Sequence, residues 1–237
     1  MLGRKPGTGH DVNTTAQPVM QQHHADAPAW RALLGDRSQL LSVRVAAAVR
    51  LGSMGHTPEA PAATAALATA LNQGHEHLTL RVAACLSLGQ LGGPRAAEAL
   101  SVVVFNRSDE RFEAPNGAGG RMPFQLLAHQ ALAQFAHGQA RLRQIVLNPQ
   151  GSGRAWGMAL STLYGSDYST LIGLASASAS DLSQALEVRL HAVAILGAEL
   201  NPGDRAGWDG LASIALARSE PELLRRTARA ALDRRRP

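Results

Sequence analysis

The chain has 237 residues, of which 45% are apolar and only 4% aromatic, and its formal net charge is +5. This length suffices for one large core or for five to six stacked helical hairpins, and the single cysteine, Cys85, excludes a framework of intrachain disulfides. Seven arginines against three acids after residue 217 give that segment a net charge of +4, so the rest is nearly neutral. One basic terminal helix is weaker evidence for nucleic-acid binding than a basic stripe along a surface.

Residues 1–27 are rich in Gly, Thr, Gln, His and Pro and carry few large apolar side chains. Such a segment cannot bury enough surface to offset its ordering entropy, which predicts a flexible N-terminal tail. The spacing of His10, His23 and His24 fits no established set of metal ligands. The segment lacks the apolar core of a signal peptide, and no run in the chain is long enough for a membrane span. We therefore expect a cytoplasmic protein, unless a leader has been removed before residue 1.

From residue 28 onward, short amphipathic stretches alternate with turns that contain Gly, Pro, Asn or Asp. Apolar residues recur at helical spacing within these stretches, Pro stands near several starts, and Gly follows several ends. Gly52 and Gly55 are expected to end a helix in the left-handed conformation. The pattern predicts about twelve helices and no convincing strand, over residues 28–35, 38–52, 57–71, 78–91, 94–105, 124–136, 139–147, 153–164, 168–177, 182–200, 208–217 and 221–235.

A repeat organises these helices. Val43-Arg44 is followed by Leu80-Arg81 after 37 residues, and Val188-Arg189 is followed by Leu224-Arg225 after 36 residues. Gly52 aligns with Gly89, and the leucines before them, Leu51 and Leu88, align as well. A period in this range is typical of helical repeat arrays. The sequence therefore predicts an all-α solenoid of about five to six hairpins over residues 28–237, with Leu88 and Leu196 in its core.

The period breaks at residues 106–123, a polar, Gly-rich segment before the helix predicted at 124–136. Aligning Leu132 with Leu88 gives a spacing of 44, so roughly seven residues have been inserted. Insertions in repeat proteins often lie at the edge that binds a partner, although a tolerated surface loop is the simpler alternative.

The pattern Val-Arg-x-x-Ala-x-x-x-Leu-Gly, with a short amphipathic helix before it, resembles the HEAT-repeat family. It is closest to the bacterial HEAT-like repeats also seen in phycobilisome lyases, and the resemblance covers roughly residues 28 to 235. In that family an Asp in the turn commonly pairs with the Arg that opens the second helix. Asp36 precedes Arg44 by eight residues, and Asp181 precedes Arg189 by eight. The resemblance thus implies a structural ladder that includes Asp36, Arg44, Arg81, Asp181 and Arg189.

No constellation of catalytic side chains stands out, so we expect a protein without enzymatic activity and without a cofactor. His75 and His77 flank Glu76 but lack further ligands, so no metal site is predicted. The glycine-rich residues 117–120 lack the Gly-Lys-Ser/Thr ending of a phosphate-binding loop.

The resemblance favours a scaffold or assembly subunit whose partner is another protein or a multi-protein assembly. Two alternatives stay open. One is a nucleic-acid-binding solenoid similar to the DNA-alkylation-repeat glycosylases, and the other is a bilin-lyase-like protein or chaperone. The scattered tryptophans and the terminal position of the arginine cluster disfavour the first alternative.

Two surfaces are candidates for partner binding. In the inserted segment, Phe112 is either an aromatic anchor for a partner or a side chain folded back onto the repeat. The terminal helix is either a solvated cap or a binding face for an acidic partner. The residues predicted for these surfaces are Arg107, Arg111, Phe112 and Arg121 in the insertion, and Arg225, Arg229 and Arg236 in the terminal helix.

Overall fold

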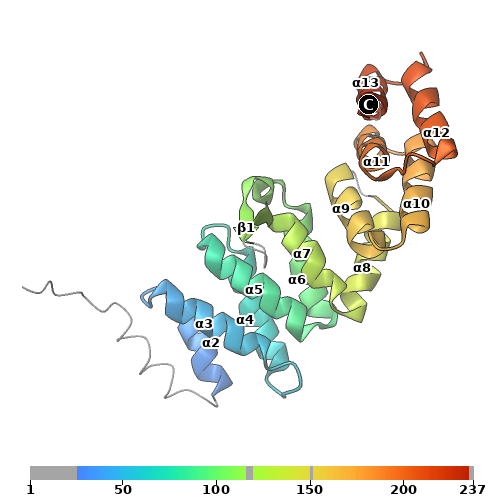
Figure 1. Ribbon diagram of the computed structural model, residues 1–237. Coiled ribbons are helices and arrows are strands. Elements are labelled where there is room, and N and C mark those ends of the chain that lie inside the picture. The colour runs from blue at the N-terminus through green and yellow to red at the C-terminus, as the bar shows by residue number, and fades with distance from the viewer. Residues whose placement is uncertain (1–25, 116–119, 150–151, 235–237) are drawn as a thin grey trace, which may run out of the picture.

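The computed structural model describes residues 26–115, 120–149 and 152–234. These residues form twelve α-helices, one 3-10 helix and one two-stranded sheet (Figure 1). The all-α prediction is confirmed. The α-helices are α2 (Ala27–Gly35), α3 (Leu41–Gly52), α4 (Ala60–Asn72), α5 (Leu78–Leu91), α6 (Gly93–Phe105), α7 (Phe124–Ala133), α8 (Ala136–Leu147), α9 (Gly153–Tyr164), α10 (Tyr168–Ser180), α11 (Leu186–Glu199), α12 (Arg205–Leu216) and α13 (Glu222–Asp233).

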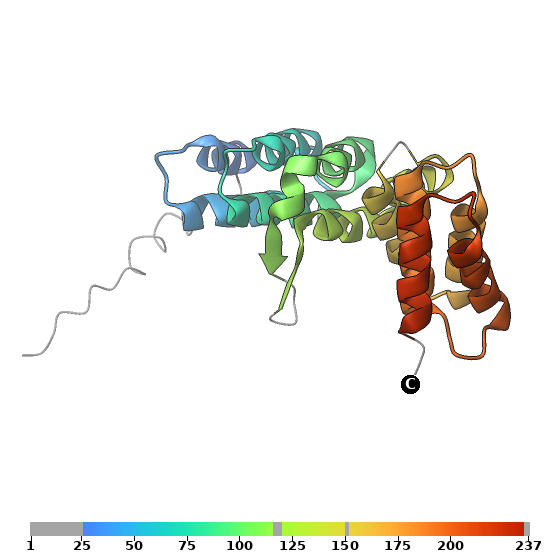
Figure 2. The same ribbon diagram turned by 90° about the horizontal axis from the view of Figure 1, so that it is seen from above.

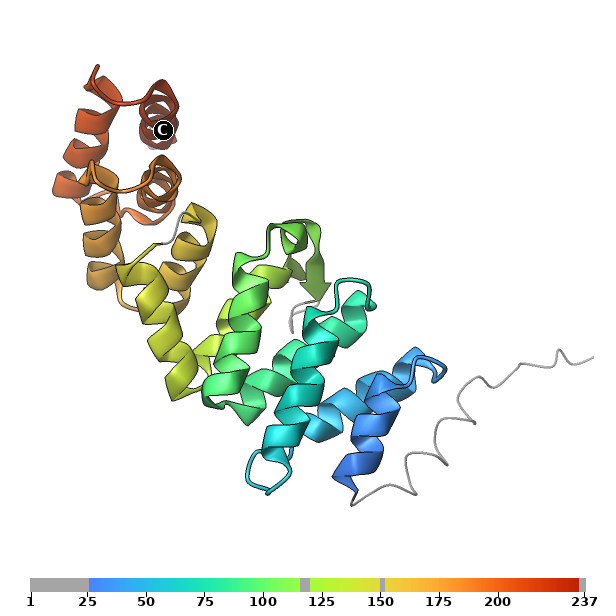
Figure 3. The ribbon, with the colours of Figure 1, turned by 180° about the vertical axis from the view of Figure 1, so that it is seen from behind.

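Consecutive helices pair into six antiparallel hairpins, and each hairpin stacks on the one before it. The array curves, as Figures 1 and 3 show from opposite sides. The first helices of the hairpins lie on the outer side of the curve, and the second helices lie on the inner side. We call these the outer and the inner helices. The molecule is therefore a curved α-solenoid of two helical layers.

The core is continuous along the array and lies between the two layers. Leu88 and Leu196 are 0% and 3% exposed, which confirms both as core residues. Replacing a buried leucine of this kind with alanine costs about 2–5 kcal/mol. Trp30 and Trp156 are the largest fully buried side chains, one in the first hairpin and one in the fourth.

The glycines of the repeat do not all act as predicted. Gly92, at the end of α5, has a φ of +67° and a ψ of −162°, a conformation that favours glycine, and its N–H donates to the Leu88 carbonyl. Gly52 and Gly55 do not adopt positive φ, so the prediction for them is wrong. A Cβ at Gly52 would lie 2.6 Å from the Cβ of Ser87 on the next inner helix. Gly52 therefore lets α3 and α5 pack closely.

The inserted segment contains regular structure. A 3-10 helix, η1 (Arg107–Arg111), leads into strands β1 (Glu113–Pro115) and β2 (Arg121–Pro123), which pair antiparallel with Ala114 opposite Met122. Figure 2 shows this hairpin projecting from the helical layers. The prediction of no strand is therefore wrong here. Three residues per strand are too few for an alternating pattern to be recognised in the sequence.

The predicted tail, residues 1–27, lies outside the described residues except for its last two, and α2 already begins at Ala27. Among the helices of the described ranges, none is both long and apolar enough to cross a membrane.

Candidate functional site

Three arginines repeat one arrangement along the inner layer. Arg44, Arg81 and Arg189 each occupy the fourth position of an inner helix. Each Nε donates to the carbonyl oxygen ten residues earlier, at 2.9, 2.8 and 3.0 Å respectively. That carbonyl belongs to the penultimate residue of the preceding outer helix, where intrahelical partners are missing. The other guanidinium N–H groups reach a carboxylate of the following hairpin. We call this set the arginine ladder: Arg44 with Glu76, Arg81 with Asp109, and Arg189 with Glu220.

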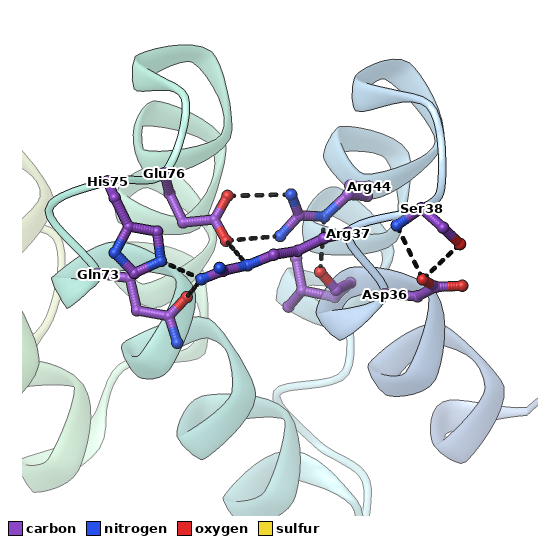
Figure 4. A network of polar contacts seen from close by, with 8 residues as sticks. Asp36, Arg37, Ser38, Arg44, Gln73, His75 and Glu76 are labelled. Carbon is purple, nitrogen blue, oxygen red and sulfur yellow. Dashed lines mark hydrogen bonds and ion pairs between the residues drawn. The ribbon is translucent and has the colours of Figure 1, made fainter.

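Figure 4 shows the first pair of the ladder. The two terminal nitrogens of Arg44 donate to the two oxygens of Glu76, both at 2.9 Å. The hydrogen bond from Arg44 holds the pKa of the Glu76 carboxyl below its ordinary value, although its partial burial acts in the opposite direction. Arg37 adds an ion pair to Glu76 at 3.4 Å and contacts His75. His77 accepts a hydrogen bond from the Thr79 N–H and so caps α5. Within the described ranges, no group of three potential metal ligands gathers.

The second pair of the ladder is the most deeply buried. The side chains of Arg81 and Asp109 are 3% and 2% exposed, and both carboxylate oxygens accept hydrogen bonds, at 2.7 and 2.8 Å. The guanidinium also lies 5.0 Å from the centre of the Phe124 ring, within the range of a cation–π interaction. Asp109 belongs to η1, so the inserted segment supplies the carboxylate that this arginine requires.

In the remaining hairpins, side chains at other positions or of other types donate to the corresponding carbonyl. Gln125 donates to the Val104 carbonyl at 3.3 Å, and the indole N–H of Trp156 donates to the Val146 carbonyl at 3.2 Å. In the last hairpin, Arg229 donates to the Ala215 carbonyl at 3.2 Å. The penultimate carbonyl of every outer helix is thus satisfied by a side chain of its inner helix. Gln125 and Trp156 are neutral, so the hairpins after them need no carboxylate.

The two turn aspartates differ from the expected Asp–Arg pair. Asp36 accepts hydrogen bonds from the N–H and hydroxyl of Ser38, at 2.9 and 2.7 Å, and Asp181 makes the same two bonds with Ser183. Both aspartates therefore close their own turns, and Arg44 reaches Glu76 instead. The pKa of the Asp36 carboxyl is lowered by hydrogen bonds from Gln39 and Ser38, and that of the Asp181 carboxyl by hydrogen bonds from Ser183. The Asp-x-Ser-Gln turn occurs in the first and fifth hairpins, and neither of these follows a ladder arginine.

Phe112, one of the predicted partner-binding residues, lies partly buried against the core. Its side chain therefore folds back onto the repeat, as in the second of the two alternatives for this residue. The Arg111 guanidinium lies 5.1 Å from the centre of its ring. Arg107 forms an exposed ion pair with Glu187 of α11 at 3.9 Å, and Arg121 pairs with Glu113 across the β-hairpin at 3.8 Å. A role of these residues in partner binding stays a prediction.

The predicted arginines of the terminal helix do not share one environment. Arg225 stands at the ladder position of α13, forms an ion pair with Glu222, and has a buried Nε without a hydrogen-bond partner. Arg229 is exposed on the helix, and Arg236 lies outside the described residues. The exposed arginines of the inner face are Arg226, Arg229 and Arg234. Arg229 follows Arg226 by three residues, and Arg234 follows Arg229 by five. A helical projection that included Arg226 and Arg234 would have identified this face from the sequence.

A groove runs along the inner layer between α9, α11 and α13. Its first part, about 480 Å³, has an apolar floor of Leu126, Met158 and Ile195. Its second part, about 540 Å³, lies on α13 beside the three arginines, and Ala194 of α11 lines both parts. We call this composite surface the inner groove. The sequence pattern did not reveal it, because Leu126, Met158 and Ile195 lie on three different helices.

A second groove, about 740 Å³, lies between the outer helices α6 and α8. Val102 and Phe105 supply apolar surface there, and Val102 is 49% exposed. The arginine at this groove, Arg141, already donates to Ser101 and Gln144. Its guanidinium is therefore held by hydrogen bonds within the chain, whereas the side chains of Arg226 and Arg234 form no hydrogen bond or ion pair within the described residues.

Comparison with known proteins identifies no family for this chain. No protein-family model matches the chain. No curated protein matches it either. Among solved structures it is similar to human deoxyhypusine hydroxylase in complex with glycerol, with a TM-score of 0.34 and 16% identity, over 92% of this chain and 97% of that one.

Because that structure is of an enzyme, the prediction of a protein without enzymatic activity is withdrawn. At this TM-score and identity, the likeness transfers no activity, substrate or ligand to this chain. The described residues form an all-α helical-repeat array that carries an arginine ladder and an open inner groove.

Proposed function

We propose that this chain is a HEAT-type protein-binding solenoid that receives a segment of a partner protein in its inner groove. The observation that carries this proposal is the composition of the groove. Apolar side chains from three inner helices adjoin exposed arginines on a fourth. Binding sites for protein segments combine an apolar anchor region with polar groups that fix orientation in this way.

The architecture supports the same proposal. Each hairpin contacts mainly its neighbours, and buried ion pairs of the ladder join the first hairpin to the second, the second to the third and the fifth to the sixth. Such an array holds side chains from several helices in fixed relative positions, which is how repeat proteins present extended binding surfaces. The inserted segment also joins the groove region, because Glu110 of η1 pairs with Arg154 of α9 at 3.9 Å.

Site-specific photo-crosslinking tests the proposal in the cells that produce the protein. A photoreactive amino acid replaces Met158 in the inner groove, and matched variants carry it at Val102 in the outer groove or at Leu182 in an exposed turn. We expect discrete protein adducts from position 158 and none from position 182. Adducts only from position 102 would move the binding site to the outer groove, and adducts from neither groove would contradict protein binding at both.

A further inference from the structure

We propose that the partner segment of the inner groove is acidic: its apolar side chains lie between α9 and α11, and its carboxylates meet the arginines of α13. This inference rests on the proposed function and specifies the chemistry of the partner. It follows from the order of the two halves of the groove, from their charges and from their length.

The apolar half has room for an anchoring side chain. Gly157 of α9 lies in its floor, and a Cβ built there would meet its nearest neighbour, the Cδ2 atom of His191, at 3.5 Å, an ordinary van der Waals distance. A methyl group would therefore fit at this position, and Met158 and Ile195 border the space of about 480 Å³ beside it with half-buried apolar surface. Covering this surface with an apolar side chain of a partner would remove apolar area from water and so stabilise the complex.

The charged half selects the sign of the partner. Arg226 and Arg234 are exposed and form no ion pair within the described residues. In this half, Arg226, Arg229 and Arg234 oppose Asp233, which leaves a net charge of +2, whereas Arg154 of the apolar half already pairs with Glu110. Charge complementarity of this kind selects partners and accelerates their encounter. Carboxylates that follow an apolar anchor would therefore reach the only strongly basic part of the chain's sequence.

The dimensions suit a short protein segment. Packed helices lie about 8–10 Å apart, so the path from α9 across α11 to α13 is about 20 Å long. About six extended residues, or about thirteen helical ones, span this distance. An apolar anchor at one end and two or three carboxylates at the other fit within either length.

The same observations favour a peptide over a nucleic acid. Proteins that bind single strands use aromatic side chains to stack bases along a basic channel. Among the described residues that line the inner groove, none is Phe, Tyr or Trp, and half of the groove is apolar with Glu199 beside it. A phosphate backbone would gain nothing from that half.

Selection of peptides tests the inference. A phage-displayed library of random peptides is panned against the full chain, and enriched peptides are measured by fluorescence anisotropy. We expect apolar residues followed by Asp or Glu, and a loss of affinity of about tenfold on raising the salt concentration, because exposed charges are screened. Arg226→Gln combined with Arg234→Gln should weaken binding by about tenfold as well.

Residue 194 offers a matched control, because Ala194 is exposed and lines both halves of the groove. Ala194→Glu and Ala194→Gln add side chains of nearly equal size, and only the first adds a negative charge. We expect Ala194→Glu to weaken the acidic peptides at least about tenfold more than Ala194→Gln does. Equal effects of the two variants would contradict an electrostatic role for this end of the groove.

The possible failures are distinguishable. Enriched peptides that are neutral or basic, and that bind independently of the arginines, would overturn the acidic partner while leaving the proposed function intact. Short DNA that competes with the best peptide and depends on the same arginines would replace the protein partner by nucleic acid. No groove-dependent peptide, together with no adduct from position 158, would overturn the proposed function itself.

Discussion

The buried pair of Arg81 and Asp109 allows one prediction to be worked out in detail. Asp109→Asn is nearly isosteric, so it changes charge and hydrogen bonding with little change in volume. In the native protein, the two carboxylate oxygens accept from Arg81 at 2.7 and 2.8 Å, and one also accepts from Asn106 at 3.1 Å. An asparagine amide presents one N–H₂ group to these donors and leaves the guanidinium, 3% exposed, without a counter-charge.

Breaking a buried ion pair by removing one partner costs about 3–5 kcal/mol. A protein of this size shifts its melting temperature by roughly 2–4 °C per kcal/mol, so we expect Asp109→Asn to melt about 6–20 °C lower. Circular dichroism measures the transition, and hydrogen exchange of the α5 and α7 amides shows whether the loss is local, as expected for a repeat array.

Two variants control this experiment. Glu222→Gln removes a carboxylate that is 56% exposed from its pair with Arg225, and it should cost no more than about 1 kcal/mol. Arg81→Met combined with Asp109→Leu removes both charges, and it should recover much of the lost stability because neither charge is then buried alone. A loss below about 1 kcal/mol for Asp109→Asn would refute the structural role assigned to the pair.

Three further predictions concern single positions. Burial lowers the pKa of His129 below its ordinary 6.5, so the unfolded state binds a proton before the native state does, and the free energy of unfolding should fall as the pH drops below 6.5. Urea titrations at several pH values should show this fall in the wild type and not in His129→Gln, and a flat wild-type profile would contradict the prediction. Burial raises the pKa of the Cys85 thiol to about 12, so a thiol reagent at neutral pH should label it only when the core opens, and rapid labelling of the native protein would be the opposite result. A Cβ at Gly153 would lie 2.2 Å from the Glu187 carbonyl oxygen, so Gly153→Ala should destabilise the protein by about 1–3 kcal/mol, whereas Gly157→Ala, whose nearest contact would be at 3.5 Å, should not. Thermal melts compare the two variants, and equal melting temperatures would argue against this close approach of α9 and α11.

The sequence was sufficient to predict the fold class because the repeat carries local signals. The spacing of Arg44 and Arg81, and the leucine seven residues after each, recur with the hairpin itself. The positions of Leu88 and Leu196 in the core follow from helical periodicity alone. Signals of this kind depend on neighbours within one helix, and they can therefore be recognised without the structure.

The partners of the ladder arginines could not be predicted in the same way. The carboxylates of Glu76, Asp109 and Glu220 lie 32, 28 and 31 residues after their arginines, and Asp109 belongs to a segment that breaks the repeat. The turn aspartates were nearer in sequence and matched the family pattern, but their side chains close their own turns through serine. Which carboxylate meets which guanidinium depends on how one hairpin stacks on the next.

The inner groove lies beside the part of the array where the ladder is interrupted. Gln125 and Trp156 replace the arginine in the third and fourth hairpins, and no buried ion pair joins α9 to the turn before α11 within the described residues. The contact between these helices depends instead on the close approach at Gly153, and the small side chain at Gly157 leaves the groove open beside it. Residues that maintain the repeat elsewhere are absent here, which is why this region matched the repeat pattern poorly. In a solenoid whose regular hairpins are committed to stacking, the hairpin that departs from the pattern has side chains free to form a binding surface.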